Sequence, residues 1–197
     1  MNWDTWCEMP PIHAESVLIQ PGYWGISSHS LLDGGWSAWL NNGGSISSIE
    51  SSTPAPKTGQ LHLRLQEQRR IRLSQLKQDY YENALLILID VRTRPEFDGQ
   101  HNPYQPRLGR LPGAVHLPFA ELFDAAGNYL TKIAYLQLLP SQIYNAHRIV
   151  AYCEVGVRSC LFALLHEAYT GQIIANFDGS IMEWALDTQL PMECNAD

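Results

Sequence analysis

The chain has 197 residues, a formal net charge of −7 and 45% hydrophobic residues. The acidic balance excludes a general electrostatic footprint for DNA or RNA, although a local nest of backbone N–H groups can still bind a small anion. The hydrophobic content is enough for a packed core, which excludes disorder throughout.

The first 60 residues differ in composition from the rest of the chain. They contain five of the six tryptophans and a single basic residue, Lys57. Residues 41–60 are rich in Gly, Ser and Pro, which is typical of a flexible linker. Residues 31–40 (LLDGGWSAWL) echo residues 176–186 (NFDGSIMEWAL), at a separation too long for a solenoid repeat but suited to two tandem domains. Because few residues precede the first copy, we expect it to keep a last strand and helix and to lack most of a domain.

Beyond residue 60, apolar segments alternate between strand-like and helix-like periods. The run ALLILIDV (84–91) is apolar until it ends in an acid and a valine, as expected of a strand buried on both faces. Strands separated by helices predict an α/β fold with a parallel sheet covered on both faces. The expected strands are 64–68 or 70–73, 84–91, 114–117, 148–152 and 173–177; the expected helices are 74–81 with Ser74 as N-cap, 119–123, 131–139, 159–169 and 179–186; and 93–112 is an expected loop.

The four cysteines, at positions 7, 153, 160 and 194, form no CxxC pair and no even framework. We therefore expect neither a zinc site nor a disulfide scaffold, and unpaired cysteines suit a reducing cytoplasm. The first residues carry acids and no basic segment, so we expect no signal peptide. The longest apolar run, 84–89, is too short to span a bilayer, so no membrane partner is expected.

Residues 148–160 (RIVAYCEVGVRSC) carry the strongest chemical signal. A buried strand ends just before Cys153, and the loop 153–158 must turn sharply, which Gly156 permits because it can adopt a positive φ. Loop amides would then surround the sulfur, and the dipole of the following helix would add positive potential. Both favour a thiolate and would stabilise a persulfide anion. The alternative is that Cys153 is one of many buried cysteines that pack as small hydrophobes.

Arg158 adds a permanent positive charge with a bidentate fork. Two interpretations are open: a contact to a bound anion, or a structural pin that forms an ion pair with Asp90 across the strand ends. Asp90 lies at the carboxyl edge of the sheet, where residues line the ligand crevice of parallel sheets, and Arg92 follows at the same edge. For both, the alternative is a solvated charge at a strand end.

Four segments together resemble the rhodanese family over residues 64–192. They are 85–97 (LLILIDVRTRPEF), 109–119 (GRLPGAVHLPF), 150–159 (VAYCEVGVRS) and 176–192 (NFDGSIMEWALDTQLPM), in the family's order. The resemblance implies a rhodanese-like five-stranded parallel sheet with helices on both faces. The echo at 31–40 is similar to the end of the first, inactive domain of two-domain sulfurtransferases. We therefore expect a remnant of that domain at 1–40, a linker at 41–63 and a catalytic domain at 64–192.

The resemblance also implies an enzyme that moves a sulfane sulfur from thiosulfate or 3-mercaptopyruvate, through a persulfide on the catalytic Cys153, to cyanide or a thiol. A thioredoxin-like reductant is a further candidate partner, and no metal or organic cofactor is expected. This chain has Glu96 where thiosulfate enzymes tend to carry a donor-binding arginine, and two nearby arginines are candidates to replace it. The expected donor-binding residues are Glu154, Val155, Gly156, Val157, Arg158, Arg94 and Arg107, and the expected structural supports are Asp90, Arg92 and Ser159.

Two other functions compete with this interpretation. One is a persulfide-carrier or protein-binding module with little turnover. The other is a phosphatase, which the loop length disfavours: phosphatase loops of this kind place the arginine six positions after the cysteine, whereas Arg158 is five after Cys153. The pair Glu154-Val155 matches neither the two basic residues of thiosulfate enzymes nor the Gly-Ser of mercaptopyruvate enzymes, so the donor stays open. Cys160 is either a resolving thiol or a buried helical cysteine, the interpretation that we favour.

The tryptophans of the first 40 residues predict apolar surface left by a missing partner domain. So short a segment can hardly offset its own ordering entropy. We expect residues 23–40 to dock on the catalytic domain and residues 41–60 to be mobile.

Overall fold

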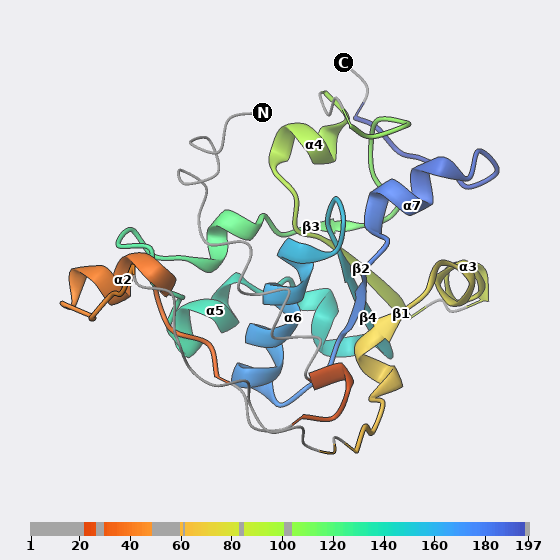
Figure 1. Ribbon diagram of the computed structural model, residues 1–197. Helices are drawn as coiled ribbons and strands as arrows, with labels where there is room; N and C mark the ends of the chain where they lie inside the picture. The colour runs from red at the N-terminus through yellow and green to blue at the C-terminus, as the bar shows by residue number, and fades with distance from the viewer. Residues whose placement is uncertain are drawn as a thin grey trace.

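The computed structural model describes residues 22–26, 30–48, 60, 62–82, 85–100 and 104–195. In this part of the chain five parallel strands form one sheet in the order β1-β5-β4-β2-β3 (Figure 1). The strands are β1 (Arg70–Ile71), β2 (Leu86–Asp90), β3 (Val115–His116), β4 (Arg148–Tyr152) and β5 (Ala175–Phe177). The predicted α/β fold with a five-stranded parallel sheet is confirmed.

The helices cover both faces of the sheet, with α5 and α6 on one side and α3 and α7 on the other (Figure 1). Alternate residues of a strand point to opposite faces, and β4 follows this rule: Ile149 and Ala151 join the core under α5 and α6, whereas Val150 and Tyr152 join the core under α3 and α7. The α-helices are α2 (Gly35–Asn41), α3 (Leu73–Glu82), α4 (Arg94–Asp98), α5 (Lys132–Leu138), α6 (Val157–Thr170) and α7 (Ser180–Leu186), and short 3₁₀ turns span Glu67–Arg69, Phe119–Leu122 and Ser141–Asn145.

Three local predictions need correction. The helix α3 begins at Leu73, so Ser74 lies inside it rather than at its N-cap. The expected loop 93–112 contains α4, which starts with a capping box in which Thr93 Oγ1 and N–H both donate to Glu96 Oε2 at 2.7 and 2.9 Å. The helix α6 begins two residues before Ser159, because Gly156 serves as its N-cap with φ of 83°.

The described part of the N-terminal segment lies against the domain that contains the sheet, as expected. The carbonyls of Tyr23 and Trp24 accept hydrogen bonds from Gln66 N and Arg64 N at 2.7 and 3.0 Å. Asp33 Oδ1 accepts a hydrogen bond from Tyr129 N at 2.9 Å. The expected mobility of residues 41–60 falls largely on residues 49–59, which lie outside the described ones.

The sequence echo has different surroundings in its two copies. In the second copy Trp184 is fully buried and lies edge-on to Tyr80 at 5.3 Å between ring centroids. In the first copy Trp39 is 39% exposed, and the neighbouring Trp36 is 59% exposed. The tryptophan that the two copies share is therefore buried in α7 and only partly covered in α2. Within the described ranges, no helix has the length and apolar character needed to cross a membrane.

Candidate active site

Cys153 directly follows β4, and 1% of its surface is exposed. Its sulfur accepts a hydrogen bond from Gly156 N at 3.1 Å and lies 3.6 Å from Ser159 Oγ, a donor hydroxyl. Gly156 has φ of 83°, and a Cβ at this position would lie 2.6 Å from the backbone of Asp178. Only glycine can close the loop tightly enough for its N–H to reach the sulfur.

The first turn of α7 anchors the loop from the other side. Ile181 N and Met182 N donate to the carbonyls of Cys153 and Glu154, both at 3.2 Å. In a trans peptide the N–H points opposite to the C=O. The N–H groups of Glu154 and Val155, which follow these two carbonyls, therefore point away from α7. Ser180 Oγ accepts from Cys153 N at 3.0 Å and donates to the Phe177 carbonyl at 2.7 Å. Ser180 has φ of 50°, a conformation that costs free energy and that the surrounding hydrogen bonds hold in place.

The electrostatics of the loop favour an anion at the sulfur. The 14-residue helix α6 starts just after Gly156, so the positive end of its dipole points at the cysteine loop. The N–H of Gly156 adds a hydrogen bond to the sulfur itself. This is the environment in which proteins activate a cysteine nucleophile. Of the loop amides expected around the sulfur, the Gly156 N–H donates to it.

Arg158 is locked to Glu96 by a bidentate ion pair. Arg158 Nη1 and Nη2 donate to Glu96 Oε2 and Oε1 at 2.9 and 2.8 Å, and the side chains are 16% and 15% exposed. Burial alone would raise the pKa of Glu96, but hydrogen bonds and charge from Arg158, followed by hydrogen bonds from Thr93, lower it to about 2. Burial lowers the pKa of Arg158, yet Glu96 and the nearby negative groups leave it raised. The structural pin therefore exists, but its partner is Glu96 rather than Asp90.

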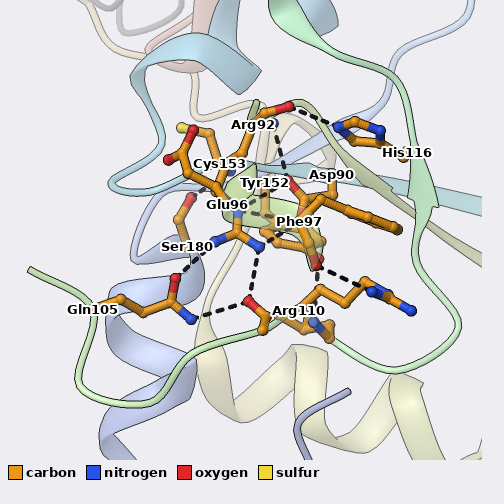
Figure 2. Close-up of polar contacts among 12 residues, drawn as sticks. Asp90, Arg92, Glu96, Phe97, Gln105, Arg110, His116, Tyr152, Cys153 and Ser180 are labelled. Carbon is orange, nitrogen blue, oxygen red and sulfur yellow. Dashed lines mark hydrogen bonds and ion pairs between the residues drawn. The ribbon is translucent and has the colours of Figure 1, made fainter. Parts of the chain in front are cut away.

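Asp90 instead forms a fully buried pair with Arg92 (Figure 2). Arg92 Nη2 donates to Asp90 Oδ2 at 2.7 Å, and Arg92 Nε lies 3.0 and 3.1 Å from the two carboxylate oxygens. The same guanidinium donates to Gln105 Oε1 at 2.7 Å and to the Gly109 carbonyl at 2.9 Å. Neither side chain of the pair is exposed, so the pair ties the end of β2 to the loop 104–110 and does not face solvent as a strand-end charge.

The two arginines expected to bind donor are engaged elsewhere. Arg107 donates to the carbonyls of Ala185, Asp187 and Leu190 at 2.9, 2.7 and 2.8 Å, so it caps the carboxyl end of α7. The expectation that Arg107 binds the donor is therefore corrected, because its guanidinium satisfies backbone carbonyls. Arg94 is 63% exposed and pairs with Asp98 one helical turn away at 2.7 Å.

Cys160 lies in the first turn of α6 and is 6% exposed. Asn176 Nδ2 lies 3.1 Å from its sulfur and also donates to the Gly156 carbonyl at 3.2 Å. This matches the packing of a buried helical cysteine that the sequence favoured. Cys194 is exposed, and Cys7 falls outside the described residues.

A cavity of about 390 Å³ lies on the outer side of the cysteine loop. Its lining joins loop residues 155–157 to Tyr23 and Trp24 of the N-terminal segment and to Arg70 and Asp178, which form an ion pair. The docked N-terminal segment thus reaches the immediate surroundings of the active-site loop. In the described part of the chain, no cluster of His, Cys, Asp and Glu is placed to hold a metal ion.

The sequence analysis missed three contributors to the site. They are the ion pair of Glu96 with Arg158, the hydrogen bond from Cys153 N to Ser180, and the hydrogen bond from Arg92 to Gln105. The pattern Thr93-x-x-Glu96 was a readable capping signal for α4. No local signal connects Glu96 to Arg158, because the two are joined only where β2 and β4 end side by side.

The model of the Rhodanese-like domain matches residues 73–187. The chain belongs to the rhodanese-like family. Its curated relatives include a thiosulfate sulfurtransferase of Corynebacterium glutamicum, 28% identical over 86% of this chain and 58% of the relative. A putative thiosulfate sulfurtransferase of Mycobacterium tuberculosis is 30% identical over 96% of this chain and 65% of the relative. A probable 3-mercaptopyruvate sulfurtransferase of Pseudomonas aeruginosa is 31% identical over 82% and 56%.

This chain thus spans less than two thirds of the length of these relatives. Among solved structures, the anaerobic ergothioneine biosynthesis enzyme from Chlorobium limicola, in complex with trimethyl histidine, is similar with a TM-score of 0.82. It is 19% identical, and the match covers 94% of this rhodanese-like chain and 46% of that enzyme. At that identity the likeness concerns the fold.

Proposed function

We propose that this rhodanese-like chain is a sulfurtransferase that carries sulfane sulfur on Cys153. The observation that carries the proposal is the Gly156 N–H at 3.1 Å from the Cys153 sulfur, at the start of α6. A sulfur held there keeps a negative charge at low cost, whether as thiolate or as persulfide. The names of the curated relatives support the same activity.

The proposed reaction has two half-reactions in a ping-pong cycle. With thiosulfate, the Cys153 thiolate attacks the outer sulfur, a new S–S bond forms, and sulfite leaves with the electron pair of the old S–S bond. With 3-mercaptopyruvate, the thiolate attacks the mercapto sulfur, the C–S bond breaks, and the carbon takes up the thiol proton to give pyruvate. In the second half-reaction cyanide or a thiol attacks the outer sulfur of the persulfide, and the Cys153 thiolate leaves.

The cycle needs no metal or organic cofactor, because each step exchanges one bond to sulfur for another. A thiol acceptor would take the sulfur as its own persulfide, and a thioredoxin-like dithiol could then release it as sulfide while forming a disulfide. Such chemistry suits a reducing cytoplasm.

The N-terminal part supports a second element of the proposal, that residues 1–40 are a remnant of a first rhodanese-like domain and residues 41–63 a linker. The helix α2 shares with α7 a preceding Asp-Gly pair and one tryptophan, but it leaves Trp36 and Trp39 partly exposed. The matching Trp184 is fully buried in the catalytic domain at 64–192, so an incomplete first copy would explain why Trp39 is partly exposed.

A persulfide-carrier module with little turnover is the second candidate, because Cys153 is only 1% exposed. A phosphatase is disfavoured by the five-residue spacing and also by the Glu96 carboxylate, which occupies the fork of Arg158 that a phosphate would need.

Mass spectrometry after treatment with each donor tests the proposal. A gain of one sulfur atom on the peptide that contains Cys153 is expected, and Cys153→Ser should remove it. Thiocyanate release with cyanide then distinguishes an enzyme from a carrier. No adduct with any donor would refute the proposed function.

A further inference from the structure

The charges beside Cys153 are almost all neutralised inside the protein. Arg158 pairs with Glu96, Arg92 pairs with Asp90, and Arg70 pairs with Asp178, which touches the loop at Gly156. Each arginine next to the loop thus has its own carboxylate, at 2.8, 2.7 and 2.6 Å respectively. A cation that is already paired offers little net attraction to an incoming anion.

One carboxylate next to Cys153 is not matched by an arginine among the described residues. Glu154 directly follows Cys153, and its side chain forms no ion pair with any of the described residues. With three paired arginines and one additional carboxylate, the described surroundings of the sulfur carry net negative charge even before Cys153 ionises. The chain as a whole is also acidic, at −7.

The other arginines expected near the donor do not alter this balance. Arg107 already donates hydrogen bonds to backbone carbonyls at the end of α7. Arg94 forms an exposed pair with Asp98, the weakest of these pairs because solvent screens it. A doubly charged donor must therefore approach a negative sulfur without a free cation nearby among the described residues.

We infer that this site takes a singly charged or zwitterionic sulfur donor, of which 3-mercaptopyruvate is an example, in preference to the thiosulfate dianion, and that Glu96 determines this choice. The inference rests on the proposed sulfurtransferase function. Glu96 acts by closing the fork of Arg158: both terminal nitrogens hold the carboxylate, so this cation does not offset the second negative charge of thiosulfate, a charge that 3-mercaptopyruvate does not carry.

Two substitutions separate the charge of Glu96 from its grip on Arg158. Glu96→Gln removes one negative charge and opens the fork. Glu154→Gln removes one negative charge from the cysteine loop and leaves the Arg158 guanidinium paired with Glu96. If the fork matters, thiosulfate should gain at least tenfold in kcat/KM in Glu96→Gln and only about threefold in Glu154→Gln.

The measurement is kcat/KM for each donor, with cyanide as acceptor and thiocyanate release as the signal. In a ping-pong cycle this ratio reports the donor half-reaction alone. Each assay is run at ionic strengths of about 0.05 and 0.5 M, because salt screens interactions between exposed charges. The wild-type protein should prefer 3-mercaptopyruvate over thiosulfate at least tenfold, and added salt should raise kcat/KM for thiosulfate. In Glu96→Gln the salt effect should be smaller, since one negative charge fewer repels the dianion and the freed Arg158 can contact it.

The salt dependence of the wild-type protein tests the inference even if Glu96→Gln folds poorly. Wild-type thiosulfate turnover that equals that of 3-mercaptopyruvate, or that falls with added salt, would overturn the inference. Equal gains in the two variants would remove Glu96 as the determinant. If no donor places sulfur on Cys153, the proposed function itself fails, an outcome distinct from a thiosulfate-preferring enzyme.

Discussion

The ion pair of Glu96 with Arg158 should make this protein's stability depend on acid in a defined way. The pKa of Glu96 falls from 4.5 to about 2 in the folded chain, mainly because Arg158 outweighs the cost of burial. Each unit of difference between the folded and unfolded pKa is worth about 1.4 kcal/mol, so the carboxylate stabilises the folded state by about 3 kcal/mol. Both partners are mostly buried, so solvent screening reduces this figure little.

The direction follows from the lowered pKa. The stabilisation is fully present above the unfolded pKa of 4.5 and is lost as the pH falls towards about 2, where folded Glu96 also takes up a proton. In Glu96→Gln this contribution is absent at every pH. The variant should therefore be about 3 kcal/mol less stable than the wild-type protein at pH 7, and the two should converge near pH 2.

Urea unfolding followed by far-UV circular dichroism measures this difference across the pH range. Glu121→Gln is the matched control, because Glu121 is exposed and removal of its charge should change stability by less than about 0.5 kcal/mol. A gap between wild type and Glu96→Gln that stays constant from pH 7 to pH 2.5 would refute the reasoning, since the loss would not then come from an ionised Glu96.

Four further outcomes are expected. Cys153→Ser should abolish sulfur transfer with an unchanged fold, whereas Cys160→Ser should retain most activity. Thiocyanate assays that show the reverse would assign the role of nucleophile to Cys160. Arg158→Lys should lower kcat/KM for 3-mercaptopyruvate at least tenfold, about 1.4 kcal/mol, because a lysine cannot hold Glu96 bidentately and so cannot brace the cysteine loop; unchanged kinetics would show that Arg158 acts only as a point charge. Gly156→Ala should destabilise by about 1–3 kcal/mol and impair alkylation of Cys153, because the new Cβ meets the Asp178 backbone at 2.6 Å; a variant with wild-type melting and labelling would contradict the tight loop. Limited proteolysis should cut within 41–60 and leave an active core; a core that unfolds without residues 1–60 would make the N-terminal segment part of the catalytic domain.

The local pattern of the sequence was sufficient for the central strands and for the position of Cys153. The strand expected at 148–152 matches β4 residue for residue, because a short apolar run with β-branched residues is typical of a buried strand. The same reasoning placed Cys153 at the carboxyl edge of the sheet and Gly156 in a left-handed turn, since both follow from a strand that must turn into a helix within a few residues.

Tertiary structure alone decided which charges meet. Asp90 and Glu96 are both near the end of β2, and the sequence offered no means to tell which of them would reach Arg158. The packing of α4 next to the start of α6 brings Glu96 to Arg158, while Arg92 folds back onto Asp90. Arg107 was misjudged for the same reason, because its carbonyl partners on α7 lie some 80 residues further along the chain. Hydrophobic period and turn chemistry act over a few residues and can be read in order, whereas ion-pair partners depend on how distant segments converge at one edge of the sheet.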